Sequence, residues 1–304
     1  MIASPPMAPL ASLALALLAS SAAAPREAKS PPPALAEAVR ATLQGFAGEV
    51  RLFAKNLDTG ASFGLGEDER VRAASTIKLA VMVEAFDRVA RGSLRWDEPL
   101  TLTAEATVGG AGILFELAPG LKLTLRDAVR LMIVISDNTA TNLVIDRLGA
   151  DAVNERMDAL GFPQTRLMRK VMGGGDSRAG LDPANKRFGL GVSTPREMVT
   201  LLEKLEKGEI VSREASAEMI AILKRQQFHD GIGRTLIGVT IANKVGALDR
   251  LRSDVALVYS DRGRIAMAIT VDDLPETVWN AENPGLLMLS RLSLALQDGL
   301  ATPR

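Results

Sequence analysis

The chain has 304 residues, 47% of them apolar and 24% charged, which is ordinary for a globular protein with one core or two packed lobes. Lys plus Arg and Asp plus Glu both total 36, so no basic excess points to a nucleic-acid partner. Cys is absent and His229 is the only His, which excludes thiol nucleophiles, disulfides and metal sites built from several His or Cys. We therefore expect no metal and no other cofactor.

The N-terminus has the pattern of an export signal. A short apolar run over 10–18 is followed by small residues up to Ala24, and the run is too short for a stable membrane anchor. No Lys or Arg precedes it, so a disordered Ala/Pro-rich tail is the alternative. We expect a signal peptide over 1–24, a Pro-rich linker over 25–34 and a folded domain over 35–304, in the periplasm or secreted.

Strand-like patterns occur at the beginning of this domain. Residues 49–53 and 62–65 alternate as strands, and the turn residues of 56–60 join them into a hairpin. A buried helix follows, with Ser75 or Thr76 near its cap. Most of 97–224 is predicted to be helical, including a helix from about 123 that ends at 136–138 and another that starts at Pro195.

The strand pattern returns near the C-terminus, over 236–244, 253–260 and 265–271, before a last helix over 282–296. Strands at both ends with helices between them predict an α+β fold. One antiparallel sheet is built from both chain ends and flanked by helices, with an inserted all-helical lobe. We expect a sheet lobe over 35–74 and 230–304, a helical lobe over 75–229, and a cleft between them.

Ser75 and Lys78 lie three residues apart, so on a helix their side chains share one face. Burial and the positive end of the helix dipole both favour a neutral amine, which can take the serine proton. By composition, a Ser-x-x-Lys arises about once by chance in a chain this long. A base other than imidazole is nevertheless expected, since a Ser-His-Asp triad could use only His229.

Two further groups could complete such a site. Ser136-Asp137-Asn138 fits a helix-terminal turn, but Ser136 could also deliver a proton to a leaving nitrogen and Asn138 could bind substrate. Lys244-Val245-Gly246-Ala247 fits a solvated Lys beside a turn glycine. Alternatively, Lys244 holds an anionic substrate, Gly246 allows close backbone approach, and the Ala247 and Ser75 N–H groups form an oxyanion hole.

Together, in this order, the three motifs resemble the penicillin-recognising serine enzymes, which include class A β-lactamases and penicillin-binding proteins. The flanking segments 121–127 and 139–142 also resemble class A, and the similarity extends over about 35–300. The resemblance implies a sheet lobe and a helical lobe with the site between them. It also implies that Ser75, Lys78 and Ser136 are catalytic and that Asn138, Lys244, Gly246 and Ala247 bind substrate.

The sequence departs from the class A pattern at two positions. Class A β-lactamases have a loop glutamate that activates the deacylating water. The corresponding residue of this chain is Val171, and Val cannot polarise water. Val245 replaces a Thr or Ser that helps to bind the substrate carboxylate. Arg252 or Arg234 could compensate by supplying a positive charge for that carboxylate. His229, Asp176 and Asp182 are interpreted as surface residues.

Three hypotheses follow. The first is a monomeric β-lactamase-like serine hydrolase that forms an acyl-enzyme on Ser75 with β-lactams or related amides. The second is a penicillin-binding or D,D-peptidase-like protein that releases its acyl group slowly, as Val171 suggests. The third is a non-catalytic descendant that binds cell-wall fragments.

Overall fold

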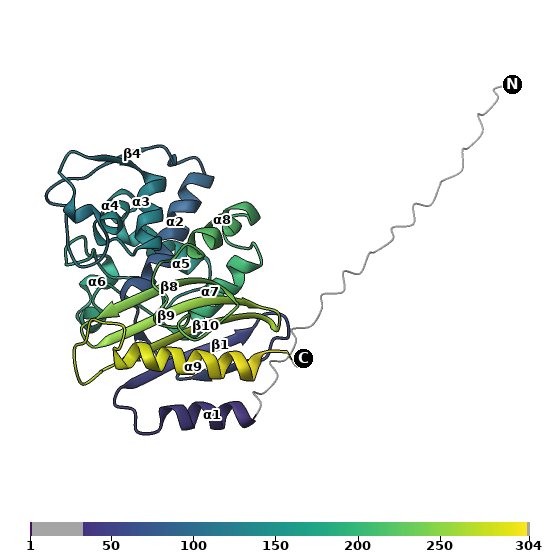
Figure 1. Ribbon diagram of the computed structural model, residues 1–304. Coiled ribbons are helices and arrows are strands. Elements are labelled where there is room, and N and C mark those ends of the chain that lie inside the picture. The colour runs from purple at the N-terminus through teal and green to yellow at the C-terminus, as the bar shows by residue number, and fades with distance from the viewer. Residues whose placement is uncertain (2–32, 303–304) are drawn as a thin grey trace.

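The computed structural model describes Met1 and residues 33–302. A central antiparallel sheet is covered on one face by α1 (Pro33–Leu43) and α9 (Pro284–Leu300), which lie side by side in Figure 1. The other helices lie on the opposite face or above it. The predicted signal peptide falls outside the described residues, and α1 begins at Pro33, inside the range assigned to the linker.

The main sheet confirms the predicted fold class. Its order is β2-β1-β10-β9-β8, so strands from both ends of the chain pair side by side. Strands β1 and β2 form the predicted N-terminal hairpin. The five strands of the main sheet are β1 (Glu49–Asn56), β2 (Ser62–Leu65), β8 (Thr240–Leu248), β9 (Leu251–Ser260) and β10 (Gly263–Asp272).

The predicted position of β8 was wrong by about four residues at each end. The strand was expected over 236–244 but runs from Thr240 to Leu248. Residues 245–248 stay in the ladder because each pairs with a residue of β9 across a tight turn, up to Leu248 opposite Leu251. Lys244 and Gly246 therefore lie within the edge strand rather than beyond its end.

The helices and the small strands occupy most of the interval between β2 and β8. The helices are α2 (Lys78–Ala90), α3 (Leu125–Val134), α4 (Asn138–Leu148), α5 (Ala150–Ala159), α6 (Arg178–Leu181), α7 (Pro195–Glu206) and α8 (Arg213–Leu223). Short 3-10 turns are η1 (Ala74–Ile77), η2 (Leu114–Glu116) and η3 (Pro183–Phe188). Two small sheets contain β3 (Val71–Arg72), β7 (Gly191–Ser193) and β6 (Arg166–Leu167), and β4 (Pro99–Thr101) with β5 (Lys122–Thr124).

Local capping chemistry sets the start of α7 but not the start of α2. Thr194 caps α7 as predicted, accepting from the Glu197 N–H, with Pro195 at the first helical position. Ser75 and Thr76 lie near the cap of α2, but they form η1, and Ile77 is the N-cap, with no side-chain hydrogen bond. The Thr76 hydroxyl instead donates to the Ala73 carbonyl at 2.7 Å.

Two large apolar clusters hold the described residues together, beside a small one of Met168, Phe188 and Val192. One fills the space between the sheet and the pair α1 and α9. The other is continuous from the opposite sheet face into the helices, and includes Phe53, Leu257 and Met132. Helix α7 lies in the sequence range assigned to the helical lobe but packs against β1 and β10. No helix among the described residues has the length and apolarity needed to cross a membrane.

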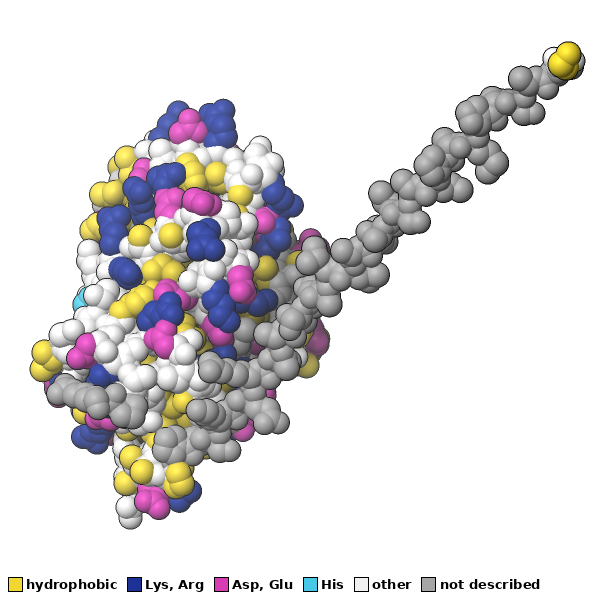
Figure 2. Space-filling model, turned by 90° about the vertical axis from the view of Figure 1, so that its right-hand side faces the viewer, with side chains coloured by type: hydrophobic (Ala, Val, Ile, Leu, Met, Phe, Trp, Pro, Cys, Tyr) yellow, Lys and Arg dark blue, Asp and Glu magenta, His cyan; other side chains and the backbone are white. Residues whose placement is uncertain are grey.

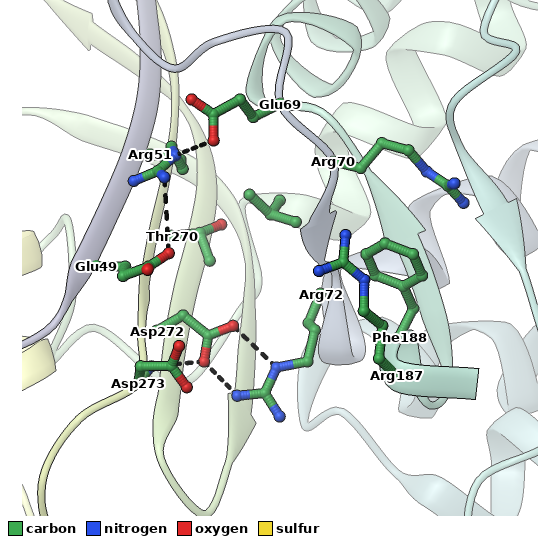
Figure 3. Close-up of a pocket in the computed structure, with 11 residues that line it drawn as sticks. Glu49, Arg51, Glu69, Arg70, Arg72, Arg187, Phe188, Thr270, Asp272 and Asp273 are labelled. Atoms are coloured by element: carbon green, nitrogen blue, oxygen red, sulfur yellow. Dashed lines mark hydrogen bonds and ion pairs between the residues drawn. The ribbon is translucent and has the colours of Figure 1, made fainter. Parts of the chain in front are cut away.

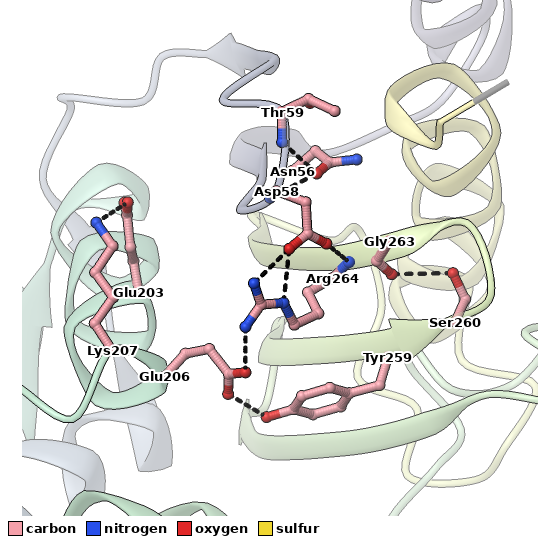
Figure 4. A network of polar contacts seen from close by, with 10 residues as sticks. All are labelled: Asn56, Asp58, Thr59, Glu203, Glu206, Lys207, Tyr259, Ser260, Gly263 and Arg264. Carbon is pink, nitrogen blue, oxygen red and sulfur yellow. Dashed lines mark hydrogen bonds and ion pairs between the residues drawn. The ribbon is translucent and has the colours of Figure 1, made fainter. Parts of the chain in front are cut away.

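A polar network joins elements at one end of the sheet (Figure 4). The Arg264 side chain contacts both Asp58, after β1, and Glu206, at the end of α7. The Tyr259 hydroxyl of β9 donates to the other Glu206 oxygen at 2.7 Å. Elsewhere charges of both signs are interspersed, as Figure 2 shows for one face.

Candidate active site

Ser75 lies in η1, against the edge strand β8. A Cβ atom at Gly246 would lie 2.9 Å from the Ala73 carbonyl oxygen and 3.2 Å from the Ser75 nitrogen, so only glycine allows this approach. Ala74, just before the serine, has a φ of 48°, a strained value for a residue with a side chain. The turn thus presents a half-buried Ser75, whose hydroxyl makes no hydrogen bond to any residue of 33–302.

Lys78 is fully buried at the first position of α2, one turn after Ser75. Its amine donates to the Ser136 carbonyl oxygen at 2.8 Å, the Ser136 Oγ at 3.2 Å and the Asn138 Oδ1 at 3.0 Å. An ammonium group could donate to all three acceptors, whereas a neutral amine could donate to two of them and keep a lone pair. The amine therefore connects the helix of the first motif to the segment of the second.

Ser136 occupies the centre of the site. Its φ of 56° is left-handed, which turns the residue out of α3 before α4 begins. Lys244, also fully buried, donates to the same Ser136 Oγ at 2.9 Å and to the Val245 carbonyl oxygen at 2.8 Å. The three predicted motifs thus meet at one hydroxyl, although Lys78 and Lys244 are 58 and 108 residues from Ser136 in the chain.

Both lysines have perturbed acidities. Burial, and then the positive charge of Lys244, lowers the pKa of Lys78 well below its usual value. Burial also lowers the pKa of Lys244 to about 7, and the Asp254 carboxylate partly opposes this shift. An amine with a lowered pKa can act as a proton acceptor near neutral pH.

The second motif also carries structural roles that sequence reasoning missed. The buried Asp137 caps α4 by accepting from the Ala140 N–H, and its other oxygen accepts from the Ile113 and Leu114 N–H groups. A side chain at Gly112 would overlap the Asp137 carboxylate. The glycine-rich segment 109–112 was the available signal, because such a segment allows close backbone approach.

Asn138 is held by the same segment. Its amide donates to the Gly109 carbonyl oxygen at 2.9 Å, and its backbone N–H donates to the Ala111 carbonyl oxygen at 3.0 Å. Since an amide nitrogen carries two hydrogens, one remains for another acceptor. The predicted substrate-binding amide is therefore oriented by contacts on both sides.

Val171 lies where the class A pattern has its loop glutamate. Its backbone is fixed by Asn142, whose Oδ1 accepts from the Val171 N–H at 2.9 Å and whose amide donates to the Val171 carbonyl oxygen at 3.2 Å. The Val171 side chain packs against the core that contains α2 and α4. The loop position is thus firmly held, but its side chain is apolar.

Arg252 and Arg234, which could compensate for Val245, make other contacts in this structure. The Arg252 guanidinium donates to the carbonyl groups of Leu248, Leu251 and Val278 and stacks on Trp279, with 4.6 Å to the ring centroid. Arg234 is paired with Glu282 at 2.8 Å. Arg252 is therefore held by carbonyl groups of the β8–β9 turn and of the loop before α9, and Arg234 is held by Glu282.

The remaining candidates lie at the surface. His229 is exposed in the segment after α8, and Asp176 is exposed in the loop before α6. Asp182 is also exposed and caps η3 by accepting from the Ala184 N–H. Ala247 lies one residue beyond Gly246 on β8 and is exposed. No group of three or more His, Asp or Glu side chains within 33–302 is arranged to hold a metal ion.

The fold and this Ser-Lys-Ser-Lys arrangement define a serine hydrolase of the β-lactamase and transpeptidase fold. The profile described as "Beta-lactamase enzyme family" matches residues 34–299, so the chain belongs to this family. A β-lactamase of Rhodobacter capsulatus is 26% identical over 280 residues, which cover 88% of this chain and 90% of the relative.

Solved structures agree with this assignment. A β-lactamase from Sphaerobacter thermophilus is 32% identical with a TM-score of 0.76, covering 89% of this chain and 98% of that one. PBP-A is 26% identical with a TM-score of 0.78, covering 89% and 97%. A leucine-to-glutamate variant of PBP-A, 27% identical with a TM-score of 0.77 and covering 89% and 97%, is described as an acyl-enzyme complex with penicillin G.

Proposed function

We propose that Ser75 attacks the carbonyl carbon of a β-lactam or related amide and forms an acyl-enzyme. The observation that carries this proposal is the convergence of the Lys78 and Lys244 amines on the Ser136 hydroxyl, beside η1. The strained turn at Ala74 and the free Ser75 hydroxyl also support it. Such a site needs no imidazole base.

The Lys78 contact with Ser136 supports the following proton path. Neutral Lys78 takes the Ser75 proton as the oxygen–carbon bond forms. Lys78 lies 3.2 Å from the Ser136 Oγ, which in turn donates its own proton to the amide nitrogen as the carbon–nitrogen bond breaks. The proton held by Lys78 then returns to Ser136, so no net proton is gained or lost.

The substrate is held by three features of the site. Lys244, when protonated, attracts an anionic group on the substrate. The free hydrogen of the Asn138 amide binds a substrate carbonyl group. The Ser75 and Ala247 N–H groups stabilise the developing oxyanion, with Gly246 allowing the close approach of β8.

A second candidate, slow release of the acyl group, is favoured by Val171. The Asn142 contacts hold the loop in place, yet valine provides no base for a deacylating water. Similarity to PBP-A, whose leucine-to-glutamate variant is described as an acyl-enzyme with penicillin G, supports the acylation step that both candidates share. The chain would then act as a penicillin-binding or D,D-peptidase-like protein rather than as a rapid β-lactamase.

We also propose that the chain is exported as a monomer, with the signal peptide and lobe boundaries given above. The short apolar run of 10–18 supports export. Accumulation in the periplasm or medium, with loss of residues 1–24, is the expected result, which fractionation and N-terminal mass analysis would check. Retention of the full-length chain inside the cell would contradict export.

Adduct formation tests the central proposal. The chain incubated with a fluorescent penicillin should gain the mass of one intact penicillin, and peptide mapping should place it on Ser75. Ser75→Ala should gain none, while remaining folded by circular dichroism. Failure of the wild-type chain to form any adduct would contradict acylation and favour a non-catalytic binding protein.

A further inference from the structure

A cleft lies between the sheet and the segment that leads to Ser75. Its volume is about 610 Å³, enough for a small ligand. One wall is formed by the start of β1 and the end of β10, and the other by β3 and the end of η3 (Figure 3). None of the proposed catalytic or substrate-binding residues lines it.

One wall of this cleft carries positive charge that is not neutralised. Arg187 and Arg70 each stack on the buried Phe188, with 4.5 Å to the ring centroid, and neither pairs with a carboxylate of residues 33–302. In Figure 3 the Arg187 guanidinium lies on the cleft side of the ring, while the Arg70 side chain leads away. Burial, and then the charges of Arg187 and Arg166, lower the pKa of Arg70.

The opposite wall is acidic. Asp272 is paired with Arg72, with 2.8 Å between its Oδ2 and the Arg72 Nε, but the neighbouring Asp273 carboxylate makes no ion pair among residues 33–302. Glu49 has only a long contact of 3.6 Å to Arg51, whose shorter contact of 2.6 Å is to Glu69. Arg51 pairs with Glu69 and Arg72 with Asp272, so the charges left without an ion pair within 33–302 are cationic on one wall, at Arg187, and anionic on the other, at Asp273.

We propose that this cleft binds a zwitterionic small molecule, an amino acid or short peptide, with its carboxylate on Arg187 and its ammonium group toward Asp273 and Glu49. A guanidinium held on an aromatic ring is oriented in advance for a carboxylate. A purely anionic ligand, such as phosphate, would be repelled by the acidic wall. A purely cationic ligand would be repelled by Arg187.

Calorimetry on the full chain with ligands of graded charge tests this proposal. The zwitterions glycylglycine, γ-aminobutyrate and 6-aminohexanoate span different charge separations, and hexanoate and hexylamine carry one charge each. At least one zwitterion should bind, and at least about tenfold more tightly than either singly charged compound. Absence of binding by all three zwitterions, or equal binding of hexanoate, would overturn the proposal.

Variants locate the binding within the cleft. Arg187→Gln should weaken zwitterion binding about tenfold or more, whereas Arg178→Gln should not. Arg178 is the matched control because it lies in the same part of the chain but is paired with Glu155 and Asp151. Asp273→Asn should reduce the preference for 6-aminohexanoate over hexanoate. Unchanged binding in Arg187→Gln would refute the site, and penicillin adduct formation should be the same in all three variants.

Discussion

Ser136 is the residue on which the proposed chemistry depends, since its hydroxyl accepts from both buried lysines. The two amines cannot both be charged at low cost, because burial in a medium of low dielectric disfavours each ammonium group. The shifts divide the roles: the pKa of Lys78 is lowered well below its usual value, and that of Lys244 is lowered to about 7. A neutral base can thus coexist with a cation that binds substrate.

The pKa of Lys244 predicts how acylation depends on pH. Below pH 7 Lys244 is protonated and attracts an anionic β-lactam, and as the pH rises through 7 this charge is lost. The second-order rate constant for adduct formation should therefore fall on the basic side, with an apparent pKa of about 7.

Lys244→Arg provides the control for this pH dependence, because a guanidinium stays protonated throughout the range. The fall of the rate constant at basic pH should disappear or move above pH 9 in this variant, whatever its absolute rate. The measurement is the rate of fluorescent-penicillin labelling between pH 5 and 10. A decline that stays near pH 7 in Lys244→Arg would assign it to a different group.

At the scale of elements, the site is assembled by the junctions between them. Asp137 lies between the end of α3 and the start of α4, and it also holds the segment before η2. The sequence predicted the end of one helix there, because Ser, Asp and Asn all favour caps and turns. It could not show that Asp137 accepts from a loop more than 20 residues away, since that contact depends on tertiary packing.

Asp137→Ala should therefore be strongly destabilising. It removes the α4 cap and leaves the N–H groups of Ile113 and Leu114 without an acceptor, which together should cost about 2–4 kcal/mol in the free energy of unfolding. Asp182→Ala, which removes an exposed cap of η3, is the matched control and should cost about 1 kcal/mol or less. Urea denaturation measures both, and equal losses would contradict this role.

Other features were predictable to different degrees. The N-terminal hairpin and α7 were predicted correctly because alternation and capping are local signals. The start of α2 was not, because η1 is set by the approach of β8 at Gly246. The bounds of β8 were displaced because its last residues are defined by pairing with β9. Contacts of Asn142 with Val171 likewise have no local signature.

At the scale of the whole molecule, one apolar cluster is shared by the sheet and the helices. The sheet's inner face and α2, α3 and α7 are therefore expected to unfold together. This continuity also keeps η1, the Ser136 turn and β8 in fixed relative positions. Catalytic groups from three distant segments require such rigid support.

Core substitutions in the helices and in the sheet should both shift the same unfolding transition. Met132→Ala in α3 and Leu257→Ala in β9 should each cost about 2–5 kcal/mol and leave one cooperative unfolding step by calorimetry. Leu294→Ala is the control, because Leu294 is exposed on α9 and should cost less than about 1 kcal/mol. Two separate transitions in either core variant would show that the lobes unfold independently.

Acylation at Ser75 is the central proposal, and slow release, with Val171 in place of a loop glutamate, is its second part. The most direct test follows the intact mass of a preformed penicillin adduct over time in wild type and Val171→Glu. We predict an adduct that persists for many minutes in wild type and decays at least about tenfold faster in Val171→Glu, which adds a carboxylate beside Asn142. Rapid loss of the wild-type adduct, with fast hydrolysis of the penicillin, would contradict the claim.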